Sequence, residues 1–92
     1  MIRSFRCRAT RRLFETGRDR RFGQIERAAT RKLVQLDNAE ELRDLASPPG
    51  NRLEALRGRR TGQHSIRIND PFRLCFRWTD HGPEDVEITD YH

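Results

Sequence analysis

Apolar residues recur at helical spacing in the first half of the chain and alternate with polar residues in the second half. The clearest helical pattern is a stripe at three- and four-residue intervals, formed by Ile25, Ala28, Ala29, Lys32, Leu33 and Leu36, with Lys32 at its edge. Arg27 and Arg31 lie off this stripe, so we expect them to face solvent. A shorter helix is predicted over residues 9–16, because Gly17 is typical of the position just after a helix end.

Shorter elements are predicted on either side of these helices. Residues 2–5 have the pattern of a short first strand, and residues 18–21 that of a polar connection. Asn38 with Glu41 resembles a capping box, a pair whose side chains satisfy the free N–H groups at a helix start. This pair predicts a further helical turn over residues 42–45.

The period changes from helical to alternating after a Pro- and Gly-rich loop at residues 47–51. Strands are predicted over residues 53–57, 65–69 and 72–78, and through Val86 and Ile88 towards His92. Turns at residues 58–62, 69–71 and 80–83 connect them. The strand over residues 72–78 has the strongest alternating pattern, and one of its faces carries Phe72, Leu74, Phe76 and Trp78. This order of elements predicts an α+β fold, with helices packed on one face of an antiparallel sheet.

Composition limits the size of this fold and points to an anionic partner. Hydrophobic residues are 34% of the chain and charged residues 36%, so we expect one small core and a single domain over residues 1–92. The net charge is +5, and 18 of the 19 basic residues are arginine. An arginine-rich basic chain is typical of nucleic-acid binding, although a GC-rich genome also raises the ratio of arginine to lysine.

Charge also varies along the chain. Residues 1–32 carry eleven basic and three acidic side chains (net +8), and residues 52–77 carry seven and two (net +5). Residues 33–51 and 78–92 have net charges of −3 and −5. Basic segments separated by acidic ones predict a basic surface and not a uniform distribution.

Several other classes of protein are disfavoured. Cys7 and Cys75 do not make a disulfide framework, and we interpret them as small apolar fillers in a reduced compartment. The first residues lack the apolar run of a signal peptide, and no stretch approaches the roughly 20 apolar residues of a membrane span. We therefore expect a cytoplasmic protein without membrane contact. Together with His64 and His81, the cysteines show no metal-ligand spacing, and no motif indicates a cofactor.

The central strand carries the main candidate for RNA binding. If its apolar residues face the helices, Arg73 and Arg77 project from the other face, which we expect to have no second layer. Further arginines fall on neighbouring strands or turns, namely Arg52, Arg57, Arg59, Arg60 and Arg67. An arginine-lined sheet face is suited to a phosphate backbone. The alternative is a solvated face that only keeps the protein in solution.

Candidate acid–base groups lie at two places. Asp90, Tyr91 and His92 end the sequence, and histidine takes up and releases protons near neutral pH. Taken alone, these residues fit a frayed tail better than a catalytic group. Glu54 lies beside an arginine-rich segment and is either an acid–base group or a solvated strand carboxylate.

The chain as a whole resembles the HigB-type toxins, or plasmid-maintenance killer proteins, of the RelE-like superfamily. The resemblance begins at Met1-Ile2-Arg3-Ser4-Phe5 and continues through Leu13-Phe14-Glu15, Arg31-Lys32-Leu33 and Leu36-Asp37. It is densest at residues 52–58, 62–69 and 72–76, and it ends with Asp90-Tyr91-His92. The order, spacing and length of these segments together are specific.

The resemblance implies a compact RelE-like fold and a toxin of a type II toxin–antitoxin system that cleaves messenger RNA on the ribosome. It implies neutralisation by a helix-turn-helix antitoxin of the HigA type, with operator DNA contacted only through the antitoxin complex. Arg73 matches the phosphate-binding arginine of the family, and Asp90, Tyr91 and His92 match its catalytic group. Arg57 stands where a basic residue, often lysine, is usual. Glu54 stands where some relatives have histidine, which leaves the division of proton-transfer roles open.

Our main hypothesis is therefore metal-independent cleavage of RNA by its own 2′-hydroxyl, with Arg73 stabilising the phosphate. Glu54, Tyr91 and His92 are the candidate proton carriers. One alternative is a non-enzymatic basic module that binds nucleic acid. Another is a protein whose arginines contact an acidic protein chain.

Overall fold

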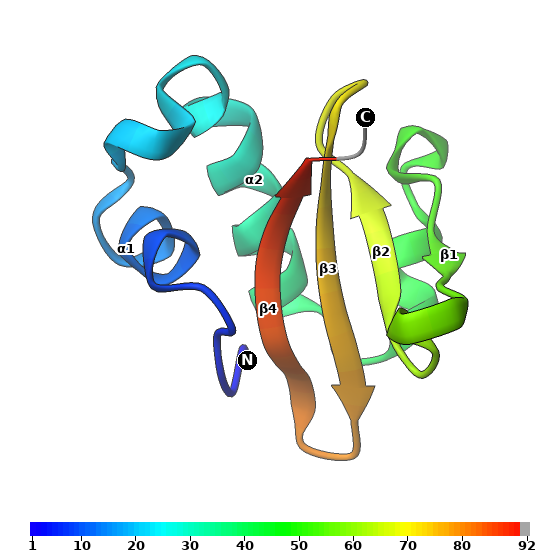
Figure 1. Ribbon diagram of the computed structural model, residues 1–92. Coiled ribbons are helices and arrows are strands. Elements are labelled where there is room, and N and C mark those ends of the chain that lie inside the picture. Colours follow the sequence, from blue (N-terminus) through cyan, green and yellow to red (C-terminus); the bar gives the residue numbers. More distant parts are fainter. Residues whose placement is uncertain (91–92) are drawn as a thin grey trace.

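The computed structural model describes residues 1–90, with two α-helices beside a four-stranded antiparallel sheet (Figure 1). The helices are α1 (Arg8–Thr16) and α2 (Glu26–Asn38). The strands are β1 (Glu54–Ala55), β2 (His64–Arg67), β3 (Phe72–Thr79) and β4 (Gly82–Asp90), adjacent in this order. In Figure 1, α2 passes behind β3 and β4, so the view is onto the opposite face of the sheet. The predicted α+β fold is confirmed.

The apolar stripe of α2 faces the sheet, as its spacing predicts. Ala29, Leu33 and Leu36 have no exposed surface. Arg27 and Arg31 are exposed, which confirms that they lie on the solvent side of the helix. Burial of one face against the sheet supplies stability that the intrinsic helix propensity of this short segment does not.

The helix α1 is closed by Gly17 and tied to β4. Gly17 has a φ of 78°, in the left-handed region, and its N–H donates to the Leu13 carbonyl at 2.7 Å. Glycine adopts this conformation without a steric penalty, so the prediction of a helix end here is confirmed. The hydroxyl of buried Thr10 accepts a hydrogen bond from the N–H of Ile88 at 3.1 Å.

The core lies between the helices and the inner face of the sheet. On the sheet side, residues without exposed surface are Ile66, Leu74, Phe76 and Val86. Phe72 and Trp78, at the two ends of β3, are partly buried against the same core. The apolar face predicted for this strand is therefore the face that packs against the helices.

A bulge in β4 interrupts the regular pairing with β3. Cys75 pairs with Glu87 and Arg77 with Glu84, so β4 contains one more residue than β3 between these pairs. Asp85 lies in the extra length with a φ of 53°. Its N–H donates to the hydroxyl of Ser4 at 2.9 Å, which fixes the bulge to the N-terminal segment.

The predicted first strand is wrong in its extent. Within residues 2–5, Phe5 alone forms a bridge, in parallel with Val86 of β4. Backbone hydrogen bonds also join Arg3 to Pro83 and Arg6 to Val86 at 2.8 and 3.0 Å. The segment therefore lies along the edge of β4, but its pairing is too irregular to extend the sheet.

Two other predictions are corrected by the structure. The capping box is formed by Glu41 with Asp44, and not by Asn38 with Glu41, and it opens the 3-10 helix η2 (Leu42–Ala46). The strand predicted at residues 53–57 shrinks to the two residues of β1.

Residues 18–21 do not form only a polar connection. They lead into the 3-10 helix η1 (Arg20–Ile25), where the Asp19 carboxylate accepts from the Arg21 N–H at 2.9 Å. This capping contact satisfies a free N–H at the start of the short helix.

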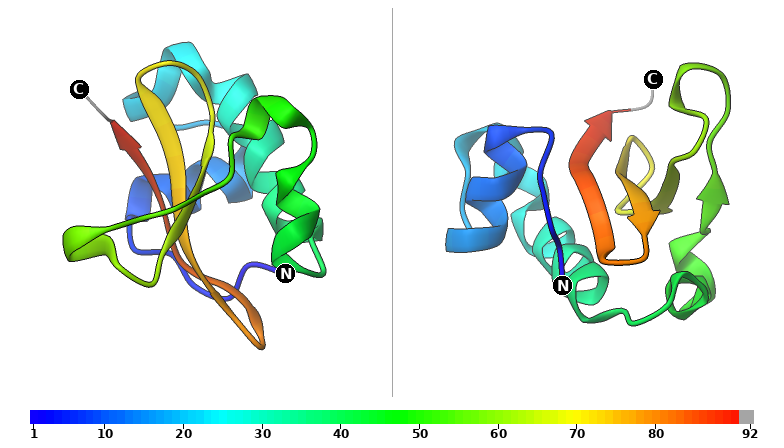
Figure 2. Two further views of the ribbon diagram at one scale, coloured as in Figure 1. Left: turned by 90° about the vertical axis from the view of Figure 1, so that its right-hand side faces the viewer. Right: turned by 90° about the horizontal axis from the view of Figure 1, so that it is seen from below.

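The segment between α2 and β2 reaches the far edge of the sheet, as both views in Figure 2 show. It contains the 3-10 helices η3 (Pro49–Asn51) and η4 (Gly58–Arg60), the latter within the predicted basic turn. Buried Asn51 fastens it, because its amide donates to the Leu45 carbonyl at 3.0 Å and its carbonyl accepts from Lys32 of α2. Within residues 1–90, no helix is long and apolar enough to cross a membrane.

Candidate functional site

Polar side chains cross the sheet in two rows on the face away from α2, here called the open face. Paired residues of antiparallel strands point to the same side, so the register defines these rows. One row runs from β1 to β4 through Glu54, Ser65, Cys75 and Glu87. The second joins Arg67, Arg73 and Thr89. Alternation along β3 places Arg77 on the same face.

Arg73 is held on the open face by three hydrogen bonds. Its Nε donates to the Ser65 hydroxyl at 2.7 Å, and its Nη2 donates to the carbonyls of Arg52 and Ser65 at 2.6 and 3.3 Å. The side chain is 14% exposed, and Nη1 has no hydrogen-bond partner among residues 1–90. Arg73 thus presents a fixed positive charge, with one end of the guanidinium group still able to donate to a phosphate.

Glu54 lies beside this arginine. One of its carboxylate oxygens is 3.9 Å from Nη2 of Arg73, and 58% of the Glu54 side chain is exposed. The structure therefore brings together two of the residues that the sequence singled out, one cationic and one able to exchange a proton.

The open face is more covered than the sequence predicted. Ser65 and Cys75 lie on it, yet both have no exposed surface. Part of the cover comes from Arg60 of η4, whose Nη1 contacts the carboxylate of Glu87 on β4 at 2.8 Å. The expectation of a face without any second layer is wrong here, because side chains from the turn before β2 extend across it.

Two other candidate arginines of this face also have acidic partners. Arg67 is paired with Asp70, and this contact holds the pKa of the Asp70 carboxyl below its usual value. Arg77 lies 3.8 Å from the carboxylate of Asp85 in the bulge. These contacts reduce the positive field of the face relative to what the arginine count alone indicates.

The remaining candidate arginines form no ion pairs with the described part of the chain. Arg52, Arg57 and Arg59 are exposed, at the β1 side of the open face. The Arg52 backbone has a φ of 46° and offers its carbonyl to Arg73, so its side chain is attached to a fixed segment. This edge therefore carries the basic groups that are most available to an incoming anion.

The end of β4 lies beside Arg73. Asp90 pairs with Phe72, and the preceding Thr89 pairs with Arg73, so the strand ends next to the start of β3 (Figure 1). Tyr91 and His92, the other two predicted members of the C-terminal group, lie outside the described residues.

Sequence reasoning missed three residues that shape this site. Ser65 orients Arg73, while Glu87 and Asp85 pair with Arg60 and Arg77. The alternation of Ile66 with its neighbours indicated which way Ser65 points, and that of Val86 and Ile88 did so for Glu87. The contact of Asp85 depends on the bulge, for which the sequence contains no clear signal.

The cysteines differ from each other and from the prediction. Cys75 is buried, as expected of an apolar filler, whereas Cys7 is half-buried at the start of α1. Burial raises the pKa of the Cys7 thiol, but hydrogen bonds from Thr10 and Ala9 and the charge of Arg21 outweigh it and lower the pKa overall. Within residues 1–90, His, Cys, Asp and Glu side chains do not gather in any group of three or more that could hold a metal ion.

Comparison with known proteins assigns a family to this chain. Residues 3–92 match the family model described as "RelE-like toxin of type II toxin-antitoxin system HigB". The chain is 52% identical over 56 residues to Toxin HigB-1 of Vibrio cholerae serotype O1, a match covering 61% of this chain and 59% of that protein. It is 35% identical over 54 residues to an uncharacterized protein of Haemophilus influenzae, covering 59% and 54% of the two chains.

The aligned part thus spans little more than half the length of either relative. The family model, by contrast, covers almost the whole chain, including the strands that carry the open face. The chain therefore belongs to the HigB-like toxins, the RelE-like toxins of type II toxin–antitoxin systems.

Proposed function

We propose that this toxin is a ribosome-dependent endoribonuclease that cleaves messenger RNA. The observation that carries the proposal is the geometry of Arg73, a guanidinium group fixed by Ser65 and the Arg52 carbonyl beside the carboxylate of Glu54. A rigid donor costs little reorganisation when charge develops on a phosphate, which is the property that electrostatic catalysis requires. Family membership and the net charge of +5 support the same reading.

The proposed reaction uses the 2′-hydroxyl of the RNA as its nucleophile. A base takes the proton of this hydroxyl, the oxygen attacks the adjacent phosphorus, and an acid protonates the 5′-oxygen as its bond to phosphorus breaks. The products are a 2′,3′-cyclic phosphate and a free 5′-hydroxyl. Arg73 stabilises the negative charge that builds on the phosphate oxygens. The scheme needs neither a metal ion nor a cofactor.

Three residues are proposed to move the protons. Glu54 lies next to Arg73 and is open to solvent, so its carboxylate can approach a bound nucleotide. Tyr91 and His92 follow the end of β4, and Asp90 is proposed to orient them. The small number of acid–base groups fits a reaction in which the ribosome positions the message, because positioning alone lowers the barrier substantially.

The basic edge is proposed to hold the message on either side of the cut. Arg52, Arg57 and Arg59 are available without breaking an ion pair. Arg60, Arg67 and Arg77 would exchange an acidic partner for a phosphate, which a guanidinium group binds with the same paired hydrogen bonds as a carboxylate.

Membership of a toxin–antitoxin family implies an antitoxin partner. We propose that it is a helix-turn-helix protein of the HigA type, through which the complex contacts operator DNA. The ribosome and its message are the other proposed partners, and the cytoplasm is the proposed location. A short neighbouring reading frame encoding a helix-turn-helix protein would support this part of the proposal.

The proposal can be tested in cells without knowing the preferred cutting site. Expression of the chain without antitoxin should arrest growth and create new 5′ ends in messenger RNA. Arg73→Ala should remove both effects, while Arg43→Ala, an exposed arginine outside the open face, should remove neither. Circular dichroism of the purified variants controls for folding, since Arg73 also anchors the Arg52 segment.

Two outcomes would contradict the proposal. A folded Arg73→Ala variant that still creates new RNA ends would remove Arg73 from the mechanism. Growth arrest by the wild-type chain without new RNA ends would favour the non-enzymatic nucleic-acid-binding alternative.

A further inference from the structure

The sequence segment with the largest net positive charge lies outside the strands of the open face. Residues 1–32, which contain α1 and the first half of α2, carry a net charge of +8, against +5 for residues 52–77. Two of the three acids in this segment are already engaged. Asp19 is paired with Arg12 at 3.3 Å, and Glu26 accepts a hydrogen bond from the Asp19 N–H at 2.9 Å.

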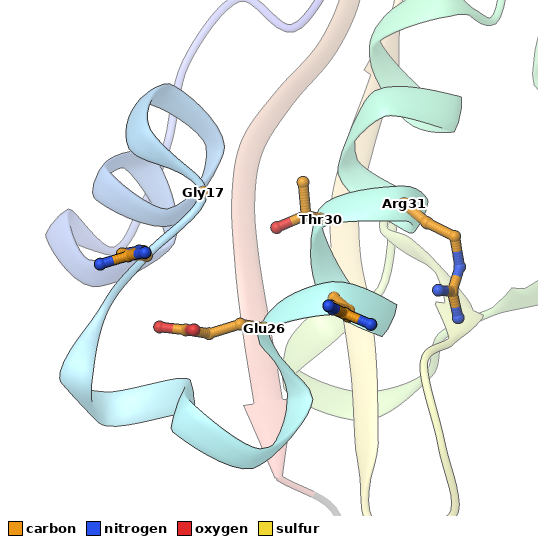
Figure 3. A pocket seen from close by; sticks show the side chains of 6 residues that line it. Gly17, Glu26, Thr30 and Arg31 are labelled. Atoms are coloured by element: carbon orange, nitrogen blue, oxygen red, sulfur yellow. The ribbon is translucent and has the colours of Figure 1, made fainter.

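A hollow of about 410 Å³ lies in this basic part, between the end of α1 and the start of α2 (Figure 3). It is lined by Gly17, Arg18, Glu26, Arg27, Thr30 and Arg31. Figure 3 shows α2 in front of the strands, whereas in Figure 1 it lies behind them, so the hollow and the open face are on opposite sides.

The three arginines around the hollow are exposed. Arg18, Arg27 and Arg31 form no side-chain hydrogen bond or ion pair with the described residues 1–90. In this they resemble Arg52, Arg57 and Arg59 at the β1 side of the open face. They contrast with Arg60, Arg67 and Arg77, each of which contacts a carboxylate. Guanidinium groups without acidic partners keep their full capacity to bind phosphate.

The arrangement fits a chain of phosphates better than a single small anion. Arg27 and Arg31 are one helical turn apart on α2, and Arg18 follows α1. In Figure 3, Glu26 and Thr30 point towards α1, whereas Arg31 extends along the other side of α2. The positive groups therefore spread over a surface and do not converge on one point.

The polarity of this surface favours RNA over a protein partner. Protein interfaces use buried aromatic and aliphatic anchors, whereas interfaces with nucleic acids are more polar and more positively charged. Within residues 1–90, the exposed large hydrophobic side chains are Met1 and Val34. Val34 alone lies on α2, which offers little apolar surface for a protein to cover.

We infer that Arg18, Arg27 and Arg31 form a second RNA-binding surface, here called the helical arginine surface, which contacts the backbone of structured RNA. The toxin then contacts RNA on two sides, with the message on the open face and surrounding RNA on the helices. The identification of that surrounding RNA as ribosomal rests on the proposed function, but the binding of structured RNA does not.

The test is the salt dependence of binding to an RNA hairpin with a long paired stem, followed by fluorescence anisotropy. Each phosphate contact that is lost should reduce the slope of log affinity against log salt by about one. Arg27→Gln/Arg31→Gln should therefore lower the slope by roughly two. Between about 50 and 200 mM salt, the affinity of this double variant should fall roughly tenfold less than that of the wild type.

A control pair separates local contacts from net charge. Arg3→Gln/Arg43→Gln makes the same change in net charge at exposed positions outside both surfaces, so its slope should equal that of the wild type. Equal slopes for the two double variants would overturn the inference, because the hairpin would then respond only to overall charge. Binding of poly-glutamate with the same slopes as the hairpin would also overturn it.

The salt slopes and the cutting of message together distinguish this inference from the proposed function. If the wild-type chain never cuts message but Arg27→Gln/Arg31→Gln still lowers the slope by about two, the helical arginine surface stands and the proposed function fails. If the chain cuts message but the two double variants have equal slopes, the proposed function stands and the helical arginine surface fails.

Discussion

At the residue scale, Arg73 has a structural role in addition to its proposed contact with phosphate, and the sequence could not separate the two. Alternation along β3 predicted correctly that it lies on the face away from the core. The structure adds that the same guanidinium fixes the Arg52 carbonyl and is itself oriented by Ser65. These partners depend on the pairing of β2 with β3 and on the backbone turn at Arg52, which are tertiary features.

We therefore propose Ser65 as a positioning residue for Arg73, and the role of its hydroxyl can be tested. Ser65→Ala removes the bond to Nε but leaves the bond from Nη2 to the Arg52 carbonyl. A hydrogen bond to a charged group contributes about 1.5–3 kcal/mol, so we expect message cutting to fall by at least about tenfold. Single-turnover cutting on programmed ribosomes measures the effect on the reaction step, apart from message binding.

The matched control is Thr61→Ala, which removes a hydroxyl that is bonded to the Gly58 carbonyl at 2.7 Å and does not contact Arg73. It should cut at the wild-type rate. Equal rates for Ser65→Ala and wild type, with folding intact, would show that the Arg52 carbonyl alone orients Arg73.

The end of the chain gives a second prediction at this scale. Deletion of His92 should reduce cutting by about 10²–10⁴-fold, the usual contribution of a positioned general acid or base. A tag added after His92 should also impair cutting, while an N-terminal tag should matter less. If the shortened chain cuts as fast as the full chain, the proton carriers have to be sought at Glu54 and elsewhere on the open face.

At the scale of elements, long regular patterns were predictable and short irregular ones were not. The stripe of α2 and the alternation of β3 each contain several residues that indicate the same period, and both elements are where the sequence put them. The predicted capping box of Asn38 with Glu41 was wrong because Glu41 has a possible partner three residues away on either side. The structure forms the contact with Asp44. The first strand failed because its position along β4 is fixed by contacts such as that between Ser4 and Asp85.

The two faces of β3 predict different effects on stability. Phe76 has no exposed surface, so Phe76→Ala should lower the free energy of unfolding by about 3–5 kcal/mol. The neighbouring Arg77 is exposed with a long 3.8 Å contact to Asp85, so Arg77→Ala should change stability by less than about 1 kcal/mol.

Thermal or urea unfolding of the two variants, followed by circular dichroism, measures this difference. Because domains of this size are only marginally stable, Phe76→Ala is expected to be partly unfolded at ordinary temperatures. A midpoint for Phe76→Ala at or above that of Arg77→Ala would mean that the packing assigned to the inner face is wrong.

At the scale of the whole molecule, composition predicted a basic protein but not how its charge is divided. The sequence pointed to one arginine-lined face. The structure instead has a partly neutralised open face and a helical side with arginines that contact no acid among residues 1–90. The difference arises because β4 brings Glu87 to Arg60 of η4 and Asp85 to Arg77 of β3, an effect of the fold that charge along the chain does not reveal.

The central claim is that Arg73, on the open face, takes part in cutting message on the ribosome. Its most direct test is primer extension on purified ribosomes programmed with a defined message, comparing the wild-type chain, Arg73→Ala and Arg43→Ala. We predict new message ends with wild type and Arg43→Ala, no ends when ribosomes are omitted, and a rate for Arg73→Ala lower by roughly 10²–10³-fold. Equal cutting by folded Arg73→Ala and wild type would contradict the account.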